Sequence, residues 1–383
     1  MSRSRRCLLA FLVLAIAAPL AAAGPPPQAN DQKTVAVMTQ NLYVGADLAP
    51  AVAAVASGDF EAIVTAVSDV WKKVQLTDFN ARAEGLAREI KAAQPALIGL
   101  QEAELWRSQT PADFVPGNAE HVESDFVATL LDALAGRGLH YAVVVEETGF
   151  DAEFPGFLSD AAALADELSD IRLTDREVIL ARTDLQTSEL KLSNPQSGNF
   201  ETNIEIPIAS DGTFVLLRGW ATVDAKVRGK SFRFVTTHLE SDLESDSERV
   251  REYQAAEILA GPADTSLPVL LVGDLNSNAN GDSSTPAYST FIGSGFVDGW
   301  LEANPGTTVS TCCNAEPLTN PTFPSPSDDF GRIDHILYRG ARDFRTLGAS
   351  LFGTDPADRV SIGLTLIWPS DHAGLAATLE IEN

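Results

Sequence analysis

Short, almost wholly apolar segments that end in acidic, amide or imidazole side chains constrain the fold of this 383-residue chain more than any other feature. Examples are residues 34–41, 96–102 and 268–274, which have the length and composition of buried strands. Helical spacing of apolar residues follows the first of them, beginning at Thr77 or Asp78 as the N-cap. Strands that alternate with helices in this way predict an α/β (α+β) domain.

Other elements are less sharply marked. An alanine-rich region at residues 48–70 predicts helix, and residues 213–224 and 231–238 predict two strands joined by a hairpin turn at Arg228-Gly229-Lys230. Residues 106–175 hold weaker patterns and are interpreted as a long insertion. Further predicted elements are helices at 126–134 and 247–260, strands at 141–145, 177–181, 333–338 and 374–381, and a loop at 305–330.

Composition excludes several classes of protein. The chain is 45% hydrophobic and 21% charged, which is typical of a globular protein and excludes intrinsic disorder. It carries 27 basic against 53 acidic residues, a formal net charge of −26, so it offers no broadly basic face to nucleic acid. Any recognition of phosphate must therefore be local.

The first residues have the order of a secretory signal peptide. Arg3, Arg5 and Arg6 precede an apolar run from residue 7 to 23, which ends in small residues and a proline-rich stretch. We therefore predict a signal peptide at 1–23, a disordered segment at 24–32, a single domain at 33–383, and a secreted or periplasmic protein. An uncleaved membrane anchor is the alternative interpretation, but the run is short for a membrane span.

Adjacent Cys312 and Cys313 are the cysteines left after such a cleavage. In an oxidising compartment they are compatible with a vicinal disulfide, with a bond to another molecule, or with buried thiols. The sequence does not choose between these three, and their spacing argues against zinc.

Polar residues at the ends of six apolar segments form the informative pattern. Singly, each has a structural explanation, such as a turn former at Asn41. Together, such strand ends are expected to gather at one edge of a sheet core, where folds commonly carry their sites. Clustered carboxylates repel one another unless a cation lies among them, and oxygen donors favour Mg²⁺ or Ca²⁺, with Mn²⁺ as a substitute. The residues are Asn41, Glu102, His238, Asp274 with Asn276, Asp334 with His335, and Asp371 with His372.

Six short motifs surround these residues: Thr39-Gln40-Asn41, Leu100-Gln101-Glu102, Thr236-Thr237-His238-Leu239, Gly273-Asp274-Leu275-Asn276, Arg332-Ile333-Asp334-His335 and Ser370-Asp371-His372. In this order they resemble the endonuclease/exonuclease/phosphatase superfamily, which includes DNase I-like nucleases, neutral sphingomyelinases and inositol polyphosphate phosphatases. The resemblance implies a four-layer α/β/β/α sandwich, two mixed sheets flanked by helices, with the site at one rim. It also implies a metal-dependent phosphoester hydrolase.

The resemblance further implies a role for each motif residue. Glu102 is the expected principal metal ligand, with Asn41 beside it and Asp371 holding the metal through water. His372 is the expected general base for the attacking water, oriented by Asp334. Because neighbours on an extended strand point to opposite faces, Asp371 and His372 require a turn to reach one site.

A second set of residues is expected at the phosphate. Asp274 and Asn276 resemble the pair that positions water and the scissile phosphate. His238 matches a histidine that contacts a phosphate oxygen or the leaving group, and Asp175 is expected to pair with it. Arg176 is a candidate phosphate contact. His121, His140 and His335 match no catalytic position and are predicted to be structural.

The substrate stays open at this stage, because a fold does not specify one. A nuclease acting on nucleic acid is the first interpretation, since a paired histidine and acid of the DNase type are expected. A sphingomyelinase-like phospholipid phosphodiesterase, or a phosphatase, is the alternative. It would use Phe150, Phe154 and Phe157 as a membrane contact, unless those rings pack against the sandwich. A catalytically silent binding protein is the third, although no metal or base residue is missing.

Overall fold

The computed structural model describes residues 33–160, 167–209, 212–241, 246–280, 285–340 and 343–381. The predicted signal peptide (1–23) and the predicted disordered segment (24–32) lie outside the described residues. No helix within the described part of the chain has both the length and the apolar character needed to cross a bilayer. The helices are α1 (Ala49–Ser57), α2 (Phe60–Leu76), α3 (Phe79–Ala93), α4 (Phe126–Gly136), α6 (Ser247–Ala260), α7 (Pro286–Gly293), α8 (Gly299–Ala303) and a 3₁₀ helix, Pro356–Asp358.

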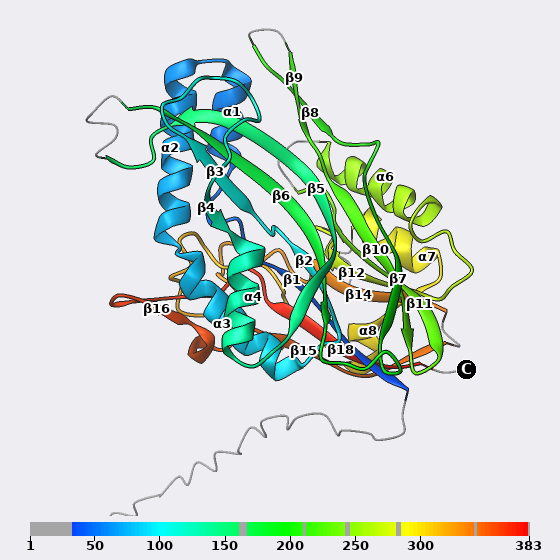
Figure 1. The fold of residues 1–383 in the computed structure, drawn as a ribbon. Coiled ribbons are helices and arrows are strands. Elements are labelled where there is room, and N and C mark those ends of the chain that lie inside the picture. The colour runs from blue at the N-terminus through cyan, green and yellow to red at the C-terminus, as the bar shows by residue number, and fades with distance from the viewer. Residues whose placement is uncertain are drawn as a thin grey trace, which may run out of the picture. The chain divides into compact units, whose positions relative to one another are not determined.

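Two mixed sheets dominate the domain (Figure 1). In the first sheet β1 runs parallel to β2 and antiparallel to β18. Its order is β15 (Phe344–Phe352), β18 (Gly374–Ile381), β1 (Thr34–Asn41), β2 (Leu97–Gln101), β6 (Ser169–Arg182), β3 (Leu105–Gln109) and β4 (His121–Asp125), with β5 (Tyr141–Gly156) also paired to β6.

The second sheet has one parallel pair, β11 with β12, and is otherwise antiparallel. Its order is β13 (Phe296–Asp298), β14 (Asp334–Arg339), β12 (Val269–Asp274), β11 (Lys230–His238), β10 (Gly219–Val227) and β7 (Lys191–Asn199). Two small hairpins complete the strands: β8 (Ile204–Pro207) with β9 (Thr213–Leu216), and β16 (Val360–Ile362) with β17 (Thr365–Ile367).

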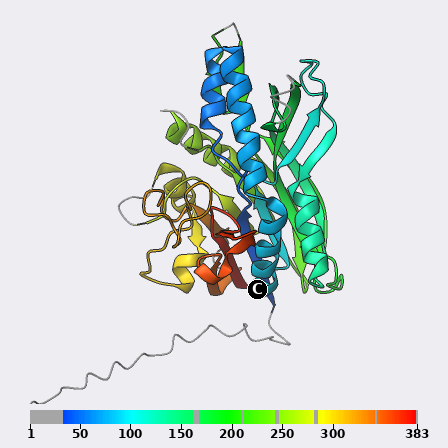
Figure 2. The ribbon, with the colours of Figure 1, turned by 90° about the vertical axis from the view of Figure 1, so that its left-hand side faces the viewer.

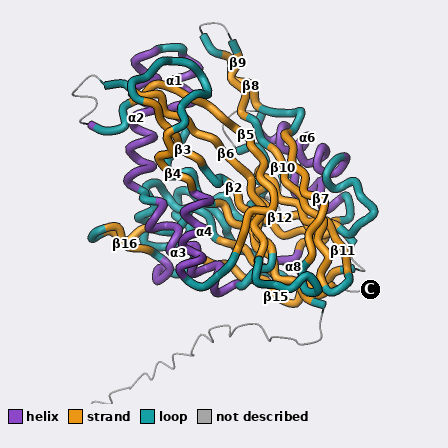
Figure 3. Tube along the Cα trace, viewed as in Figure 1, coloured by secondary structure: helices purple, strands orange, loops and turns teal. Residues whose placement is uncertain are grey.

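A shared apolar core lies between the two sheets. Val37 and Ile179 of the first sheet and Phe234 and Val272 of the second belong to this core, and all four are fully buried. Each such side chain stabilises the fold by about 1.5–3 kcal/mol relative to leaving it exposed. Helices α2, α3 and α4 cover the outer face of the first sheet, and α6 and α7 that of the second (Figures 2 and 3). The predicted class of two mixed sheets flanked by helices is confirmed, and the arrangement is consistent with four layers.

Some boundaries differ from the sequence-based expectation for local reasons. The helix expected at 48–70 is divided into α1 and α2, because Gly58 adopts a left-handed conformation with φ 67°. Asp59 then caps α2 by accepting hydrogen bonds from the backbone amides of Glu61 and Ala62. The strand expected at 213–224 is divided between β9 and β10.

Residues 106–175, interpreted from sequence as an insertion, mostly build the first sheet. They contain most of β3, all of β4, α4 and β5, and the first part of β6. Strand β5 pairs with β6 over almost its whole length. The region therefore extends the sheet and does not stand apart from it.

Candidate active site

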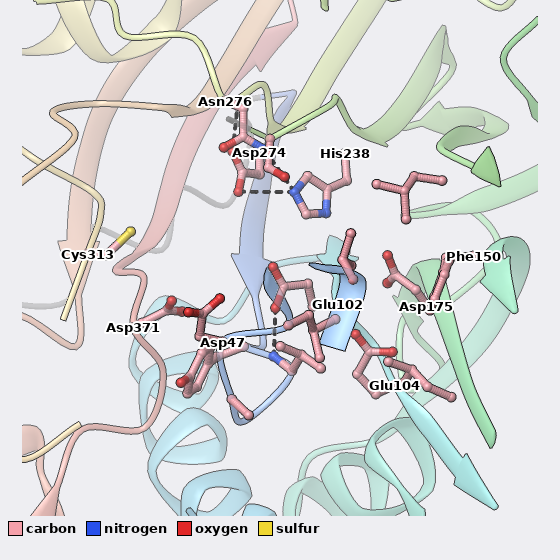
Figure 4. A pocket seen from close by; sticks show the side chains of 18 of the residues that line it. Asp47, Glu102, Glu104, Phe150, Asp175, His238, Asp274, Asn276, Cys313 and Asp371 are labelled. Atoms are coloured by element: carbon pink, nitrogen blue, oxygen red, sulfur yellow. Dashed lines mark hydrogen bonds and ion pairs between the residues drawn. The ribbon is translucent and has the colours of Figure 1, made fainter. Parts of the chain in front are cut away.

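The polar strand ends of the two sheets meet at one rim of the domain (Figure 4). In the first sheet β1 and β2 are parallel and in register, so Asn41 and Glu102 leave the sheet side by side. In the second sheet His238 lies opposite Asp274, and Asp274 lies opposite Asp334. Asn41 joins the two groups, because its Nδ2 donates to Oε1 of Glu102 at 3.0 Å and to Oδ2 of Asp274 at 3.2 Å.

Unusual backbone conformations direct these side chains into the site. Glu102 and Asn276 have φ values of 50° and 47°, a left-handed region that non-glycine residues rarely occupy and that clusters at functional sites. Gly273 has φ 150°, and a Cβ there would lie 2.1 Å from the carbonyl oxygen of Thr237. The Glu102 carboxylate is fixed further by the amide of Val44, which donates to its Oε2 at 2.6 Å.

A buried arginine that the sequence analysis did not identify holds the loop after β1. Arg82 of α3 is fully buried and donates to the carbonyl oxygens of Leu42, Tyr43 and Thr77 at 2.5, 3.0 and 3.1 Å. Burial lowers its pKa to about 10, so it stays a cation at neutral pH. The available sequence signal was its position three residues after Phe79, on the apolar face of a predicted helix.

His372 and Asp334 form a close pair. His372 Nδ1 lies 2.9 Å from Oδ2 of Asp334, whose backbone amide donates to Oγ1 of Thr311 at 3.0 Å. The other ring nitrogen, Nε2, faces Oδ2 of Asp274 at 3.7 Å and Oδ1 of Asp371 at 4.0 Å. Burial lowers the pKa of His372, but these three carboxylates outweigh it and raise that pKa well above its usual value. The geometry is that of an imidazole whose free nitrogen faces a cluster of acids.

The direct pair expected between His238 and Asp175 is not formed. Arg218 lies between them, with Nη1 3.0 Å from Oδ2 of Asp175 and 3.0 Å from Nδ1 of His238. Because a guanidinium only donates, Nδ1 must accept and Nε2 carries the proton. The protonated Nε2 faces Oδ2 of Asp274 at 3.5 Å, and the amide group of Asn276, whose Nδ2 is 3.0 Å from Nε2, donates to the carbonyl oxygen of Leu239 at 3.0 Å. Burial and the charge of Arg218 lower the pKa of His238 well below its usual value, so the ring is a neutral donor towards the cluster.

Arg218 also neutralises a buried group of acids. Asp175, Glu177 and His238 lie close enough to share a cation, and the guanidinium supplies positive charge there. Its Nε is 3.9 Å from Oε1 of Glu240. Burial nevertheless raises the pKa of Asp175 to about 6 and that of Glu177 well above its usual value. No sequence signal indicated this role, because Arg218 belongs to no motif and lies between β9 and β10.

Replacing Arg218 by methionine is expected to destabilise the domain by about 3–5 kcal/mol, because buried carboxylates lose their counter-charge. Chemical denaturation measures the loss, and the pKa of His238, followed by NMR titration, is expected to rise. Arg249→Met, which removes a side chain that is 62% exposed, is the control. Equal stability of the two variants would contradict the assigned role of Arg218.

Arg176, expected at the substrate phosphate, is not brought to the site. Its side chain is buried and donates to the carbonyl oxygens of Ala103 and Glu104 at 2.7 and 3.2 Å, and to Oδ1 of Asp125 at 2.7 Å. It does not line the cavity at the rim. Arg176 therefore supports the chain after β2 instead of contacting a ligand.

The donors at the rim fit a hard divalent cation. Carboxylate oxygens of Glu102, Asp274 and Asp371 face the same cavity beside the amide of Asn41 (Figure 4). Burial raises the pKa of Asp274 to about 7, with a further increase from Asp334. Burial and the charge of Glu102 also raise the pKa of Asp371 to about 7, against the opposing effect of His372. Such acids ionise fully when a cation lies among them, and oxygen donors of this type suit Mg²⁺, Mn²⁺ or Ca²⁺.

The two cysteines lie at the edge of the same site. The structure records a disulfide between Cys312 and Cys313, one of the three alternatives that the sequence left open. Sγ of Cys313 is 3.9 Å from Nε2 of His372. Sulfurs joined in a disulfide do not act as thiolate ligands, so this grouping is not assigned a metal.

The remaining predicted residues lie outside the catalytic cluster. Phe150 and Phe154 are half-buried and pack on Phe214, with their ring centroids 5.3 and 5.8 Å from the centroid of its ring. Packing within the domain therefore fits these two residues better than a contact with a membrane. Phe157 is also half-buried. His121 and His140 are exposed, whereas His335 is buried with Nε2 2.9 Å from the carbonyl oxygen of Ser277.

Comparison with known proteins agrees with this geometry. A model of the Endonuclease/Exonuclease/phosphatase family matches residues 38–372. The chain belongs to this family. All six motifs of the sequence analysis fall within or at the edge of the matched range, and membership confirms the resemblance. No curated protein matches the chain.

Solved structures show how far the family fold extends over the chain. A family protein from Bacteroides thetaiotaomicron is 16% identical, with a TM-score of 0.53, and the match covers 91% of this chain and 98% of that one. A mannosyl-6-phosphatase from the same organism is 15% identical, with a TM-score of 0.52 and coverage of 90% and 99%. A family protein from Bacteroides vulgatus is 16% identical, with a TM-score of 0.53 and coverage of 91% and 99%. At this identity the likeness shows the fold alone.

Proposed function

We propose that this family member hydrolyses phosphoesters with the help of a divalent cation. The observation that carries the proposal is the His372–Asp334 pair, 2.9 Å apart, with the second ring nitrogen turned towards the carboxylates of Asp274 and Asp371. A base that faces acids in a cavity is suited to activating water beside a bound cation. All these residues are present, which favours catalysis over a silent binding protein.

The protein's own residues account for the activation of the attacking water and for the stabilisation of charge on the phosphoryl group. His372 Nε2 takes a proton from the attacking water, and Asp334 stabilises the resulting imidazolium through Nδ1. The water oxygen bonds to phosphorus as the bond to the leaving oxygen breaks, and that oxygen takes a proton from solvent. His238 Nε2 and Asn276 Nδ2 donate to the phosphoryl oxygens, which stabilises charge that develops there.

Glu102, Asp274, Asp371 and Asn41 are the residues that would hold the cation. When bound, it supplies positive charge that polarises the phosphoryl group and offsets the repulsion between an anionic substrate and these acids. Without such a charge the rim would repel phosphate, since the chain carries a net charge of −26.

The identity of the phosphoester is a separate matter. The nuclease interpretation stays a prediction, and the direct His238–Asp175 pair that favoured it is replaced by a pair bridged through Arg218. Export of the protein, predicted from residues 1–23, also stays a prediction.

Hydrolysis of bis(4-nitrophenyl) phosphate by the purified protein tests the proposal. With excess EDTA we expect the rate to fall on the order of 100-fold or more, because the charge opposite the phosphoryl oxygens is removed. Adding back Mg²⁺, Mn²⁺ or Ca²⁺ should restore it, and the order of restoration identifies the preferred ion. Undiminished hydrolysis in EDTA after dialysis would contradict the role of the cation.

A further inference from the structure

A large apolar chamber opens from the candidate active site. The cavity that contains Glu102, Asp274 and His372 has a volume of about 1020 Å³ and extends well beyond them. This is at the upper end of the range for small-molecule sites. Its far part is lined by α1, α2, the ends of β3, β5 and β6, and the β8–β9 hairpin. One cavity therefore contains both the charged residues of the active site and an apolar part.

The chamber walls are held by specific contacts. The β8–β9 hairpin rises beside β5 at the end of the domain where α1 lies (Figure 1). Ile206 and Leu216 of the hairpin pack with Val52 of α1, and the backbone amide of Ala209 donates to the carbonyl oxygen of Ala56 at 3.0 Å. Phe214 packs on the rings of β5 described above. Two of the three phenylalanines singled out in the sequence, Phe150 and Phe154, thus form a wall of this chamber.

Side chains deeper in the chamber are apolar. Val67 and Val70 of α2, Trp106 of β3, and Ile171 and Leu173 of β6 all line it and are at least nine-tenths buried. A cavity with such walls favours apolar ligand groups, because water inside it gains few hydrogen bonds.

The charge of the cavity disfavours a polyanion. Its described walls contain two arginines, Arg218 and Arg251, and no lysine, against eight aspartates and glutamates. Arg218 already contacts Asp175 and His238. A nucleic acid chain needs cationic groups along successive phosphates, and this cavity does not offer such a track. The carboxylates are Asp47, Glu102, Glu104, Asp175, Asp274, Glu316, Asp328 and Asp371.

We infer that the chamber binds the aliphatic chain of a phosphoester whose single phosphate lies among Glu102, Asp274 and His372. The inference rests on the proposed function and adds a substrate class to it, namely an amphipathic, chain-bearing phosphoester. We assign the chamber to an aliphatic chain because the chamber and the active site form one cavity. A chain attached to the reacting phosphate can therefore extend directly from the site into the chamber.

A series of 4-nitrophenyl alkyl phosphates with methyl, butyl and octyl chains, used below their micelle concentrations, tests the inference. We expect kcat/KM to rise by up to about fourfold for each added methylene that becomes buried, until the chamber is filled. In a separate arm with EDTA, calorimetry measures the binding of 1-octanol, which carries no phosphate and needs no cation.

Two substitutions on different lining elements complete the test. Ala152→Trp on β5 and Ala51→Phe on α1 place bulk at lining positions, and we expect each to abolish the chain-length dependence and octanol binding. The methyl ester should still be cleaved within about twofold of the wild-type rate, which also reports correct folding. Ala142→Trp is the matched control, since Ala142 lies on the same strand, is exposed and does not line the cavity.

The outcomes separate the two proposals. Hydrolysis that is independent of chain length, or cleavage of plasmid DNA that exceeds that of the octyl ester and is unchanged in Ala152→Trp, would overturn the chamber as a chain site and leave the hydrolase proposal standing. Absence of hydrolysis for every ester, with octanol still bound, would overturn the proposed function and with it the chamber's role in substrate binding.

Discussion

Replacing Glu102 by glutamine is expected to lower kcat/KM for phosphoester hydrolysis on the order of 1000-fold, because it removes a charge from the centre of the cation site. Both carboxylate oxygens of Glu102 are already positioned, by Asn41 Nδ2 at 3.0 Å and by the amide of Val44 at 2.6 Å. A glutamine retains the shape but directs an amide group against one of these two donors. The loss should therefore appear as weaker binding of the cation as well as slower turnover.

Isothermal calorimetry of Mg²⁺ or Mn²⁺ binding, together with the dependence of the rate on metal concentration, measures both effects. Glu316→Gln is the matched control, since Glu316 lines the same cavity, is exposed and pairs with Lys73 at 3.1 Å. It should retain activity within about twofold, as surface substitutions generally have little effect. If Glu102→Gln bound the cation with wild-type affinity, the assignment of Glu102 as a ligand of the cation would be wrong.

Replacing His372 by alanine is expected to lower kcat by about 10²–10⁴, the usual contribution of a positioned general base. In the wild type the rate should rise with pH, because only the neutral imidazole accepts a proton from water. The acid limb of that profile should be absent in His372→Ala. Replacing His121, which is exposed and does not line the cavity at the rim, should change neither the rate nor the profile.

Replacing Asp334 by asparagine tests whether His372 is the group that titrates, because it predicts the direction in which the acid limb of the pH–rate profile moves. The negative charge of Asp334 raises the pKa of His372, so removing it should move the acid limb of the profile to lower pH. The maximal rate should fall as well, because the ring loses its orienting partner at 2.9 Å. A limb that stays in place, or that moves to higher pH, would show that another group is titrating.

A large part of the site was predictable from the sequence, because every catalytic candidate except Asp175 belongs to a short motif beside a strand end. The chain bends at Asp371, as required, and Ser370 holds this bend: its Oγ donates to the carbonyl oxygen of Asn41 at 2.7 Å and accepts from the amide of His372 at 3.1 Å. Such local requirements follow from backbone geometry and are visible in a linear sequence.

Contacts between distant segments were not visible in the same way. Asp175, Arg176 and Glu177 are consecutive on β6, and their side chains alternate between the two faces of the sheet. Sequence alone did not decide which face meets the site, and Arg176 was therefore expected there. Arg218 was missed because it belongs to no motif. The guanidinium that contacts His238 belongs to Arg218, which is 20 residues away in the chain and lies in the short connection between β9 and β10.

Sequence by itself determined which side chains end the strands, and hence the oxygen donors, because periodicity and turn residues are local properties of the chain. The pairing of His372 with Asp334 was expected only from the resemblance to the family. Only the tertiary structure decided that Arg218 separates Asp175 from His238, and that the phenylalanines of β5 line a chamber joined to the site. The physical reason is that charge compensation and cavity shape depend on which buried surfaces pack together, and packing brings together residues with no fixed relation in sequence.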